Sequence, residues 1–185
     1  YNWFVDENRP DRNELFINHV KRVKEIAEKH GFTDTAIWFD NLFGMNYKGY
    51  IDPPEWLFKD FPALVRENFP DIRLIFWNYG ITDLGDFVRT VGYIRQLSDR
   101  VSFASMAHGY TSFAPQNSIT ERLVQTALDG CRKTGITDLM ITWWGSKMSP
   151  LALMPSYYDY AERTSETVGY TEDERAEFLY GHTYT

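Results

Sequence analysis

The chain has 185 residues, of which 43% are hydrophobic and 24% are charged, and its formal net charge is −7. This length and composition indicate one globular domain with a sizeable core and exclude a disordered chain. The acidic balance argues against nucleic acid or an anionic membrane as a partner, and no apolar run reaches the roughly 18 residues that a transmembrane helix needs. Because Cys131 is the single cysteine, an internal disulfide is excluded.

The chain alternates between two kinds of segment. Short runs rich in β-branched and aromatic residues predict strands at 35–39, 72–77, 101–105 and in the first part of 136–150. Apolar residues at helical spacing predict helices at 11–31, 55–68, 84–94, 118–134 and 150–163. The apolar face of the first helix is expected to contain Phe16, Val20, Val23 and Ala27. The inward face of the fourth helix is expected to contain Ile119, Leu123, Ala127 and Cys131.

Two of the strands are entered through the same short pattern. The segments HGFTDTAIW, which begins at His30, and TGITDLMIT, which begins at Thr134, share a glycine, an apolar residue, Thr-Asp and a later isoleucine. Each segment predicts a helix that stops at the glycine, a tight turn and the start of a strand. A repeat of this kind is typical of a (β/α) barrel, whose units are built alike.

Strands that alternate with amphipathic helices predict an α/β fold with a parallel sheet. A closed barrel needs eight strands, so residues 1–165 are expected to form about half of a TIM-type barrel, with a C-terminal extension at 166–185. A small open doubly wound sheet is the alternative, and the lack of a Gly-rich phosphate loop after any strand makes it weaker. The start at Tyr1, without a methionine or a signal-like segment, indicates a piece of something longer.

Aromatic residues gather at the C-terminal ends of the strands, where such folds carry their active sites. Three of these ends contain tryptophan, in WFDNLF, FWNYG and WWGSKMSP, and the fourth, ASMAHGYTSFAP, contains His108 and Tyr110. Rings that converge from separate strand ends form an aromatic-walled pocket on which the apolar face of a sugar stacks. The alternative for any single tryptophan is that it fills the top of the barrel, and for His108 that it is structural.

Four motifs follow one another in the order that a known barrel would require. They are IWFDNLF, LIFWNYG, YTSFAPQNS with the downstream ALDGCRKTGI, and ITWWGSKMSPLALMPSYYDYAE. From about Asp6 to Glu162 the chain resembles the second half of the catalytic barrel of family 20 glycoside hydrolases, the β-N-acetylhexosaminidases, and especially their bacterial exo-acting branch. The resemblance implies hydrolysis of terminal β-linked amino sugars with retention, in which the acetamido oxygen of the substrate attacks the anomeric carbon.

The resemblance places the general acid outside this chain. In the family a glutamate is the acid and its neighbouring aspartate orients the acetamide, at the end of a strand that would precede residue 11. We therefore expect no catalytic residue among these 185 residues. Asp6 and Glu7 form such a pair in sequence, but they fall in the approach to a helix, and we interpret them as a solvated turn.

The resemblance also implies residues that contact the substrate. Trp38 and Asp40 match a Trp-x-acid motif whose tryptophan forms part of the wall around the acetamide. Trp144 matches the tryptophan under the sugar ring, and Trp77 is expected in the same cleft because it ends the second strand.

Other positions depart from the family pattern. Phe76 stands where the family has a tyrosine that binds the acetamido oxygen, and phenylalanine has no hydroxyl. Asn78 stands where the family has an aspartate that holds the acetamide N–H, and asparagine brings no charge. The shortened loop at 146–148 lacks the acid that binds sugar hydroxyls. His108 and Tyr110 stand where the family has tryptophans, and His108 and Asp40 could supply new polar contacts.

Two functions from different classes are consistent with these residues. The first is a divergent exo-acting glycosidase that acts on a glycan or glycoside, with the isolated chain inactive; the second is a non-catalytic carbohydrate-binding or scaffold half-barrel. The open strand edges at 35–39 and 139–142 are expected to meet the remaining half of the barrel or a second copy of the chain. No cofactor is expected. Metal-ligand spacing is absent from the four histidines, which are His19, His30, His108 and His182.

Overall fold

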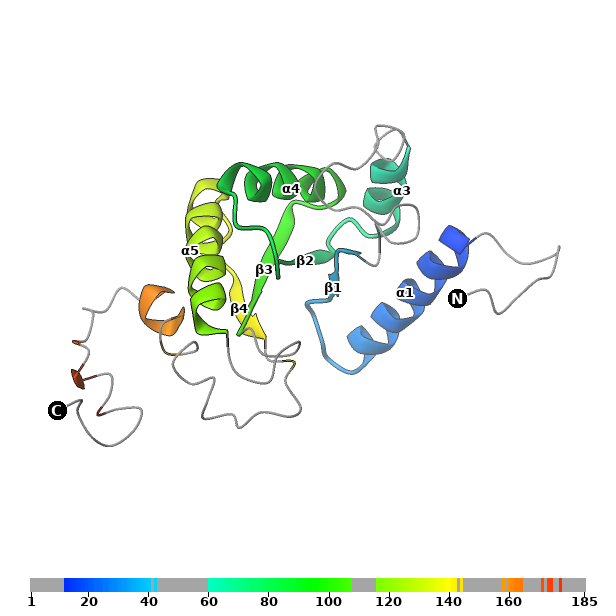
Figure 1. Cartoon of the computed structure of the whole chain (residues 1–185). Helices are drawn as coiled ribbons and strands as arrows, with labels where there is room; N and C mark the ends of the chain where they lie inside the picture. Colours follow the sequence, from blue (N-terminus) through cyan, green and yellow to red (C-terminus); the bar gives the residue numbers. More distant parts are fainter. Residues whose placement is uncertain are drawn as a thin grey trace, which may run out of the picture. The chain divides into compact units, whose positions relative to one another are not determined.

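The chain folds into helices and a parallel sheet. A computed structural model describes residues 12–40, 42, 60–107, 116–142, 144, 158, 160–164, 171, 173–174 and 177. Its elements are α1 (Arg12–Lys29), β1 (Ala36–Trp38), α3 (Phe61–Asn68), β2 (Arg73–Trp77), α4 (Leu84–Leu97), β3 (Arg100–Met106), α5 (Asn117–Thr134) and β4 (Leu139–Thr142) (Figure 1). The strands form one four-stranded parallel sheet in the order β1-β2-β3-β4.

This architecture confirms the predicted α/β fold and parallel sheet, and it makes β1 and β4 the outer strands of that sheet. Each predicted helix and strand is found where it falls within the described residues, with ends shifted by a few positions. The start of the helix expected at 55–68 and that of the helix expected at 150–163 lie outside the described residues. Strands that follow one another in chain order are compatible with part of a (β/α) barrel.

Two glycines end α1 and α5 in the same way, as the repeated sequence pattern predicts. Gly31 has φ 88° and Gly135 has φ 70°, a left-handed conformation that favours glycine because it has no Cβ. After α1, the N–H of Phe32 reaches the carbonyl of Ala27 at 3.0 Å. After α5, the N–H of Ile136 reaches the carbonyl of Cys131 at 3.0 Å. Both contacts span five residues and satisfy a carbonyl that the helix leaves open.

The chain divides into two compact units, which are described separately. Unit 1 contains Tyr1–Phe76 and Arg89–Ser102, and unit 2 contains Trp77–Val88 and Phe103–Thr185. The largest fully buried side chains of unit 1 are Phe39, Leu42, Phe69, Ile72, Leu74, Phe76, Ile94 and Leu97. In unit 2, Val124, Leu128 and Tyr160 form a buried cluster against which Leu139 and Ile141 of β4 pack.

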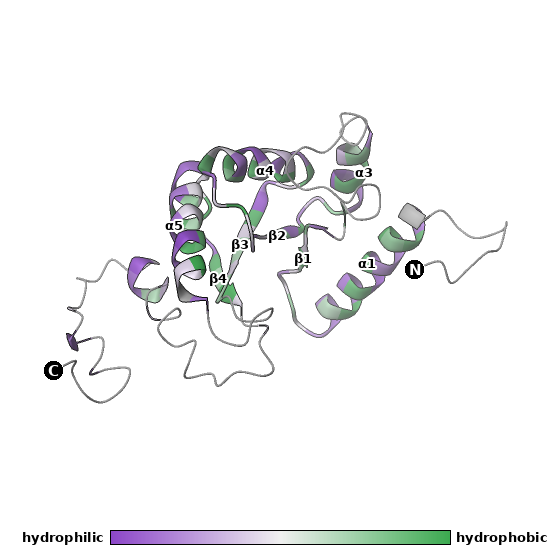
Figure 2. Ribbon diagram, in the orientation of Figure 1, coloured by the Kyte–Doolittle hydropathy of each residue, from purple (hydrophilic) through white to green (hydrophobic). Residues whose placement is uncertain are grey.

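The inward face of α5 agrees with the sequence pattern, whereas that of α1 differs in part. Leu123, Ala127 and Cys131 are buried, which confirms them as core residues of α5. On α1, Val20 is buried, whereas Val23, which the sequence pattern places on the same apolar face, is 48% exposed. Figure 2 shows hydrophobic and hydrophilic residues interleaved along α1.

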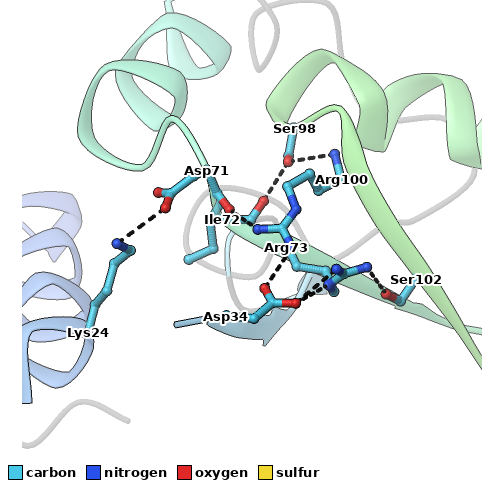
Figure 3. Close-up of polar contacts among 8 residues, drawn as sticks. All are labelled: Lys24, Asp34, Asp71, Ile72, Arg73, Ser98, Arg100 and Ser102. Atoms are coloured by element: carbon cyan, nitrogen blue, oxygen red, sulfur yellow. Dashed lines mark hydrogen bonds and ion pairs between the residues drawn. The ribbon is translucent and has the colours of Figure 1, made fainter. Parts of the chain in front are cut away.

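An ion-pair network ties the beginnings of β2 and β3 to the segment before β1 within unit 1 (Figure 3). The carboxylate of Asp34 accepts hydrogen bonds from Nε and Nη2 of Arg73, at 3.2 and 2.9 Å, and from Nη2 of Arg100 at 2.8 Å. Arg73 also donates to Oγ of Ser102 at 3.3 Å. Asp34 precedes β1, and Arg73 and Arg100 are the first residues of β2 and β3, so the network lies at the N-terminal ends of these strands.

Candidate functional site

The C-terminal ends of the strands carry the residues expected to form the site. Trp38, Asp40 and Phe76 belong to unit 1, and Trp77, Asn78 and Trp144 belong to unit 2. His108 and Tyr110 lie outside the described residues, as do Asp6 and Glu7. The convergence of these tryptophans in one cleft stays a prediction.

In unit 1, the end of β1 presents an aromatic ring followed by an acid. Trp38 is the last residue of β1 and is half-buried, in register with Ile75 of β2. Two residues later, Oδ1 of Asp40 is buried and has no hydrogen-bond partner among the described residues. A buried polar atom normally has a partner, so Oδ1 of Asp40 is an exception among the described residues.

Phe76 lies in the core of unit 1. Its side chain is buried, and its ring meets that of Phe39 edge to face, with centroids 5.6 Å apart and an interplanar angle of 86°. Side chains alternate along β2, so Leu74 and Phe76 point to one face while Ile75 and Trp77 point to the other. Phe76 therefore contributes packing, and its expected contact with substrate stays a prediction.

Asn78 follows β2 and is 2% exposed. Its amide oxygen accepts the N–H groups of Gly80 at 2.9 Å and Ile81 at 2.6 Å, and its amide nitrogen donates to the carbonyl of Ile81 at 2.7 Å. A carbonyl oxygen has two lone pairs, and both are engaged here. The described geometry therefore gives Asn78 a role in shaping the loop after β2.

That loop presents Tyr79, which the sequence analysis did not select. The ring centroids of Tyr79 and Trp77 are 4.6 Å apart at an interplanar angle of 48°. The hydroxyl of Tyr79 lies 3.2 Å from Oγ1 of Thr142, the last residue of β4, and accepts a hydrogen bond from the indole Nε1–H of Trp144. Tyr79 thus joins two of the predicted site residues, Trp77 and Trp144, into one cluster, here called the aromatic cluster.

A sequence signal for Tyr79 was available in the motif FWNYG. An asparagine two residues before a glycine is typical of a turn that the asparagine side chain closes. The residue between them is then displayed at the tip of the loop. What the sequence could not supply was the partner, because Thr142 and Trp144 are 63 and 65 residues away along the chain.

The single cysteine and a nearby tyrosine lie apart from this cluster, in the core of unit 2. Burial raises the pKa of the Cys131 thiol to about 12, and burial also raises the pKa of Tyr160. A thiol that keeps its proton at neutral pH is a poor nucleophile. Within the described ranges no group of His, Cys, Asp and Glu side chains could hold a metal ion. In the same part of the chain, no helix has the length and apolar character needed to cross a bilayer.

The rings of the aromatic cluster are partly accessible to solvent. Trp144 is 53% exposed, and Trp77 and Tyr79 are half-buried. Aromatic faces of this kind bind flat, C–H-rich surfaces. No family model matches the chain, and no curated protein is similar to it.

Proposed function

We propose that the chain is part of a carbohydrate-active protein that resembles an exo-acting β-N-acetylhexosaminidase, with the general acid upstream of these residues. The observation that carries this proposal is the aromatic cluster of Trp77, Tyr79 and Trp144 at the C-terminal ends of the strands. Such ends hold the active site in (β/α) folds, and the exposed ring of Trp144 offers a surface for a pyranose.

Asp40 supports a polar contact in the same function. Its buried Oδ1 has no hydrogen-bond partner within the described ranges, and a sugar hydroxyl or an acetamide N–H would satisfy it. Trp38, two residues before Asp40, would then form part of the pocket wall next to this carboxylate. In this proposal the site binds terminal β-linked amino sugars. Asp40 accepts a hydrogen bond from the sugar and does not transfer a proton.

A non-catalytic sugar-binding module is the second candidate. The roles of Phe76 and Asn78 favour it, because the first is packed in a core and the second is committed to its own loop. Neither is then available to hold an acetamide in the way that substrate-assisted chemistry needs. The aromatic cluster would in that case bind sugar without turnover.

The proposal also includes a protein partner that covers exposed apolar side chains of unit 1. Leu15, Val23, Ile26 and Phe32 of unit 1 are exposed, with Phe32 at 65%. Large apolar side chains that gather on a surface mark a contact with another protein surface. We infer that this face meets the remaining half of the barrel or a second copy of the chain.

The test of sugar binding is a titration of the purified chain with N-acetylglucosamine and with methyl β-glucoside, followed by tryptophan fluorescence and calorimetry. We expect weak saturable binding that Trp144→Ala reduces about tenfold or more, the effect typical of an aromatic anchor. A matched control is Trp56→Ala, which leaves the predicted strand-end tryptophans in place. If neither sugar binds, or if Trp144→Ala and Trp56→Ala lose affinity equally, this proposal has no basis.

A further inference from the structure

Four polar groups in unit 2 form one continuous hydrogen-bond chain. It begins at the indole N–H of Trp144, passes through the hydroxyls of Tyr79 and Thr142, and ends at the backbone carbonyl of Ser105, 3.0 Å from Oγ1 of Thr142. A threonine hydroxyl has one proton, and Thr142 donates its proton to Ser105. The Tyr79 hydroxyl must therefore donate to Thr142 and accept from Trp144.

The backbone that carries Ser105, Thr142 and Tyr79 is fixed by hydrogen bonds of the sheet and of the loop after β2. Ser105 and Thr142 lie in the paired strands β3 and β4, and the N–H of Ala107 reaches the carbonyl of Thr142 at 3.1 Å. The loop that carries Tyr79 is closed by the amide of Asn78, and the N–H of Asn78 is bonded to the carbonyl of Ala104 at 3.1 Å. Tyr79 is thus held from both sides, by its loop and by Thr142.

Trp144 receives its orientation from this arrangement. It lies beyond the end of β4 and is 53% exposed, so several rotamers are open to an indole at such a position. The hydrogen bond to Tyr79 selects one of them and keeps the ring displayed. Fixing a recognition ring before the ligand arrives reduces the ordering cost of binding.

We propose that Tyr79 is the positioning residue of the aromatic cluster, and that it makes Trp144 bind its ligand through the face of the indole and not through the N–H. This inference rests on the proposed sugar-binding function and specifies its ligand. The indole N–H is committed to Tyr79, so the ligand must offer a flat C–H-rich face, as a β-linked pyranose does. A ligand that needs a hydrogen bond from this indole would have to break the hydrogen bond between Trp144 and Tyr79.

The first measurement is made without ligand. The indole ¹H–¹⁵N resonance of Trp144, assigned with Trp144→Phe, is followed by hydrogen exchange in the wild-type chain and in Tyr79→Phe. Removal of the acceptor hydroxyl should accelerate exchange of this one indole proton and shift its resonance, while the other indole signals stay in place. Tyr93→Phe, which removes a hydroxyl from α4, is the matched control and should leave the Trp144 signal unchanged.

The second measurement adds sugar. N-acetylglucosamine should shift the carbon-bound ring protons of Trp144 and leave its indole N–H protected. In Tyr79→Phe the affinity should fall about 2- to 10-fold, the range that one neutral hydrogen bond supports. If Tyr79→Phe does not fold, Thr142→Val replaces it, because it removes the acceptor of the Tyr79 proton with little change in side-chain shape.

The two measurements separate the two claims. Equal exchange of the Trp144 indole proton in the wild type, Tyr79→Phe and Thr142→Val overturns the inference, whether or not sugar binds. Loss of indole protection when sugar binds also overturns it, because the N–H would then contact the ligand. Protection that Tyr79→Phe removes, in a chain that binds no sugar, supports the positioning role and refutes the proposed function alone.

Discussion

Gly130 of α5 lies directly against the ring of Phe87 of α4, so that a Cβ built on Gly130 would overlap three carbon atoms of that ring. Phe87 is buried and packs against Phe103 of β3, with ring centroids 5.2 Å apart. Because Phe87 is fully buried and also packed against Phe103, its ring has little room to move. The contact between these two helices in unit 2 therefore depends on the absence of a side chain at position 130.

Overpacking a filled core costs about 1–3 kcal/mol, and alanine in place of glycine returns about 1 kcal/mol of helix propensity. Gly130→Ala should therefore destabilise the fold by up to about 2 kcal/mol. Urea unfolding followed by circular dichroism gives the change in the free energy of unfolding. Gly92→Ala on α4 is the control, because nothing lies within 4 Å of a Cβ there, and it should be neutral or stabilising. Similar effects of the two substitutions would contradict the packing argument.

Asp34 should make stability depend on acid. Hydrogen bonds from Arg73, and then from Arg100, hold the pKa of the Asp34 carboxyl below its ordinary value of 3.8. A lowered pKa means that the unfolded chain takes up the proton first, so the contribution of Asp34 is present above about pH 4 and is lost as pH falls through the folded-state pKa. The unfolding free energy of Asp34→Asn should therefore fall less steeply than that of the wild type below pH 4. A slope identical to that of the wild type would show that the network does not act on this carboxyl.

Cys131 should be unreactive in the folded chain and should make stability depend on alkali. Burial raises the pKa of its thiol from 9.0 to about 12, so the folded state keeps a proton that the unfolded chain releases. Its contribution is complete below pH 9 and is lost between about pH 9 and pH 12, at up to about 1.4 kcal/mol per pH unit. Urea unfolding at pH 8 and pH 10 should show a steeper loss in the wild type than in Cys131→Ala. Rapid alkylation of the native thiol at pH 8 would disprove burial of this group.

The isolated chain should not hydrolyse an aryl N-acetyl-β-glucosaminide at a measurable rate. General acid catalysis contributes about 10²–10⁴-fold, and the family resemblance places the acid upstream of residue 1. The assay is release of the aryl group by the purified chain at several pH values. Activity that disappears in Asp40→Asn or in Glu7→Gln would identify a catalytic carboxylate within the chain and contradict this prediction.

The isolated chain should associate in solution. The outer strands β1 and β4 end the sheet, and Val23, Ile26 and Phe32 expose apolar surface in unit 1. Sedimentation velocity over a range of concentrations should show species larger than one chain. The double substitution Val23→Lys and Ile26→Lys should shift the distribution toward the monomer, while Glu25→Lys, on the same helix, should not. A strictly monomeric wild type would rule out the second-copy alternative.

Local sequence determined the order and type of the elements. A helix that stops at Gly31 or Gly135 depends on residues within one turn, because only glycine readily adopts the left-handed conformation found there. The strands that follow these glycines, AIW and LMIT, contain β-branched or aromatic residues. Helices between parallel strands leave few topologies open. The parallel sheet and the inward face of α5 could therefore be predicted without coordinates.

Tertiary structure decided which side chains serve the site. Phe76 and Trp77 are neighbours in sequence, yet one is buried and the other half-buried, because adjacent residues of a strand point to opposite faces and packing chooses the core face. The sequence predicts Asn78 as a ligand contact, whereas in the structure its amide closes its own loop. Tyr79 gained a role only because folding places Thr142 beside it. Contacts across more than sixty residues depend on the register of whole strands, and no local pattern encodes that register.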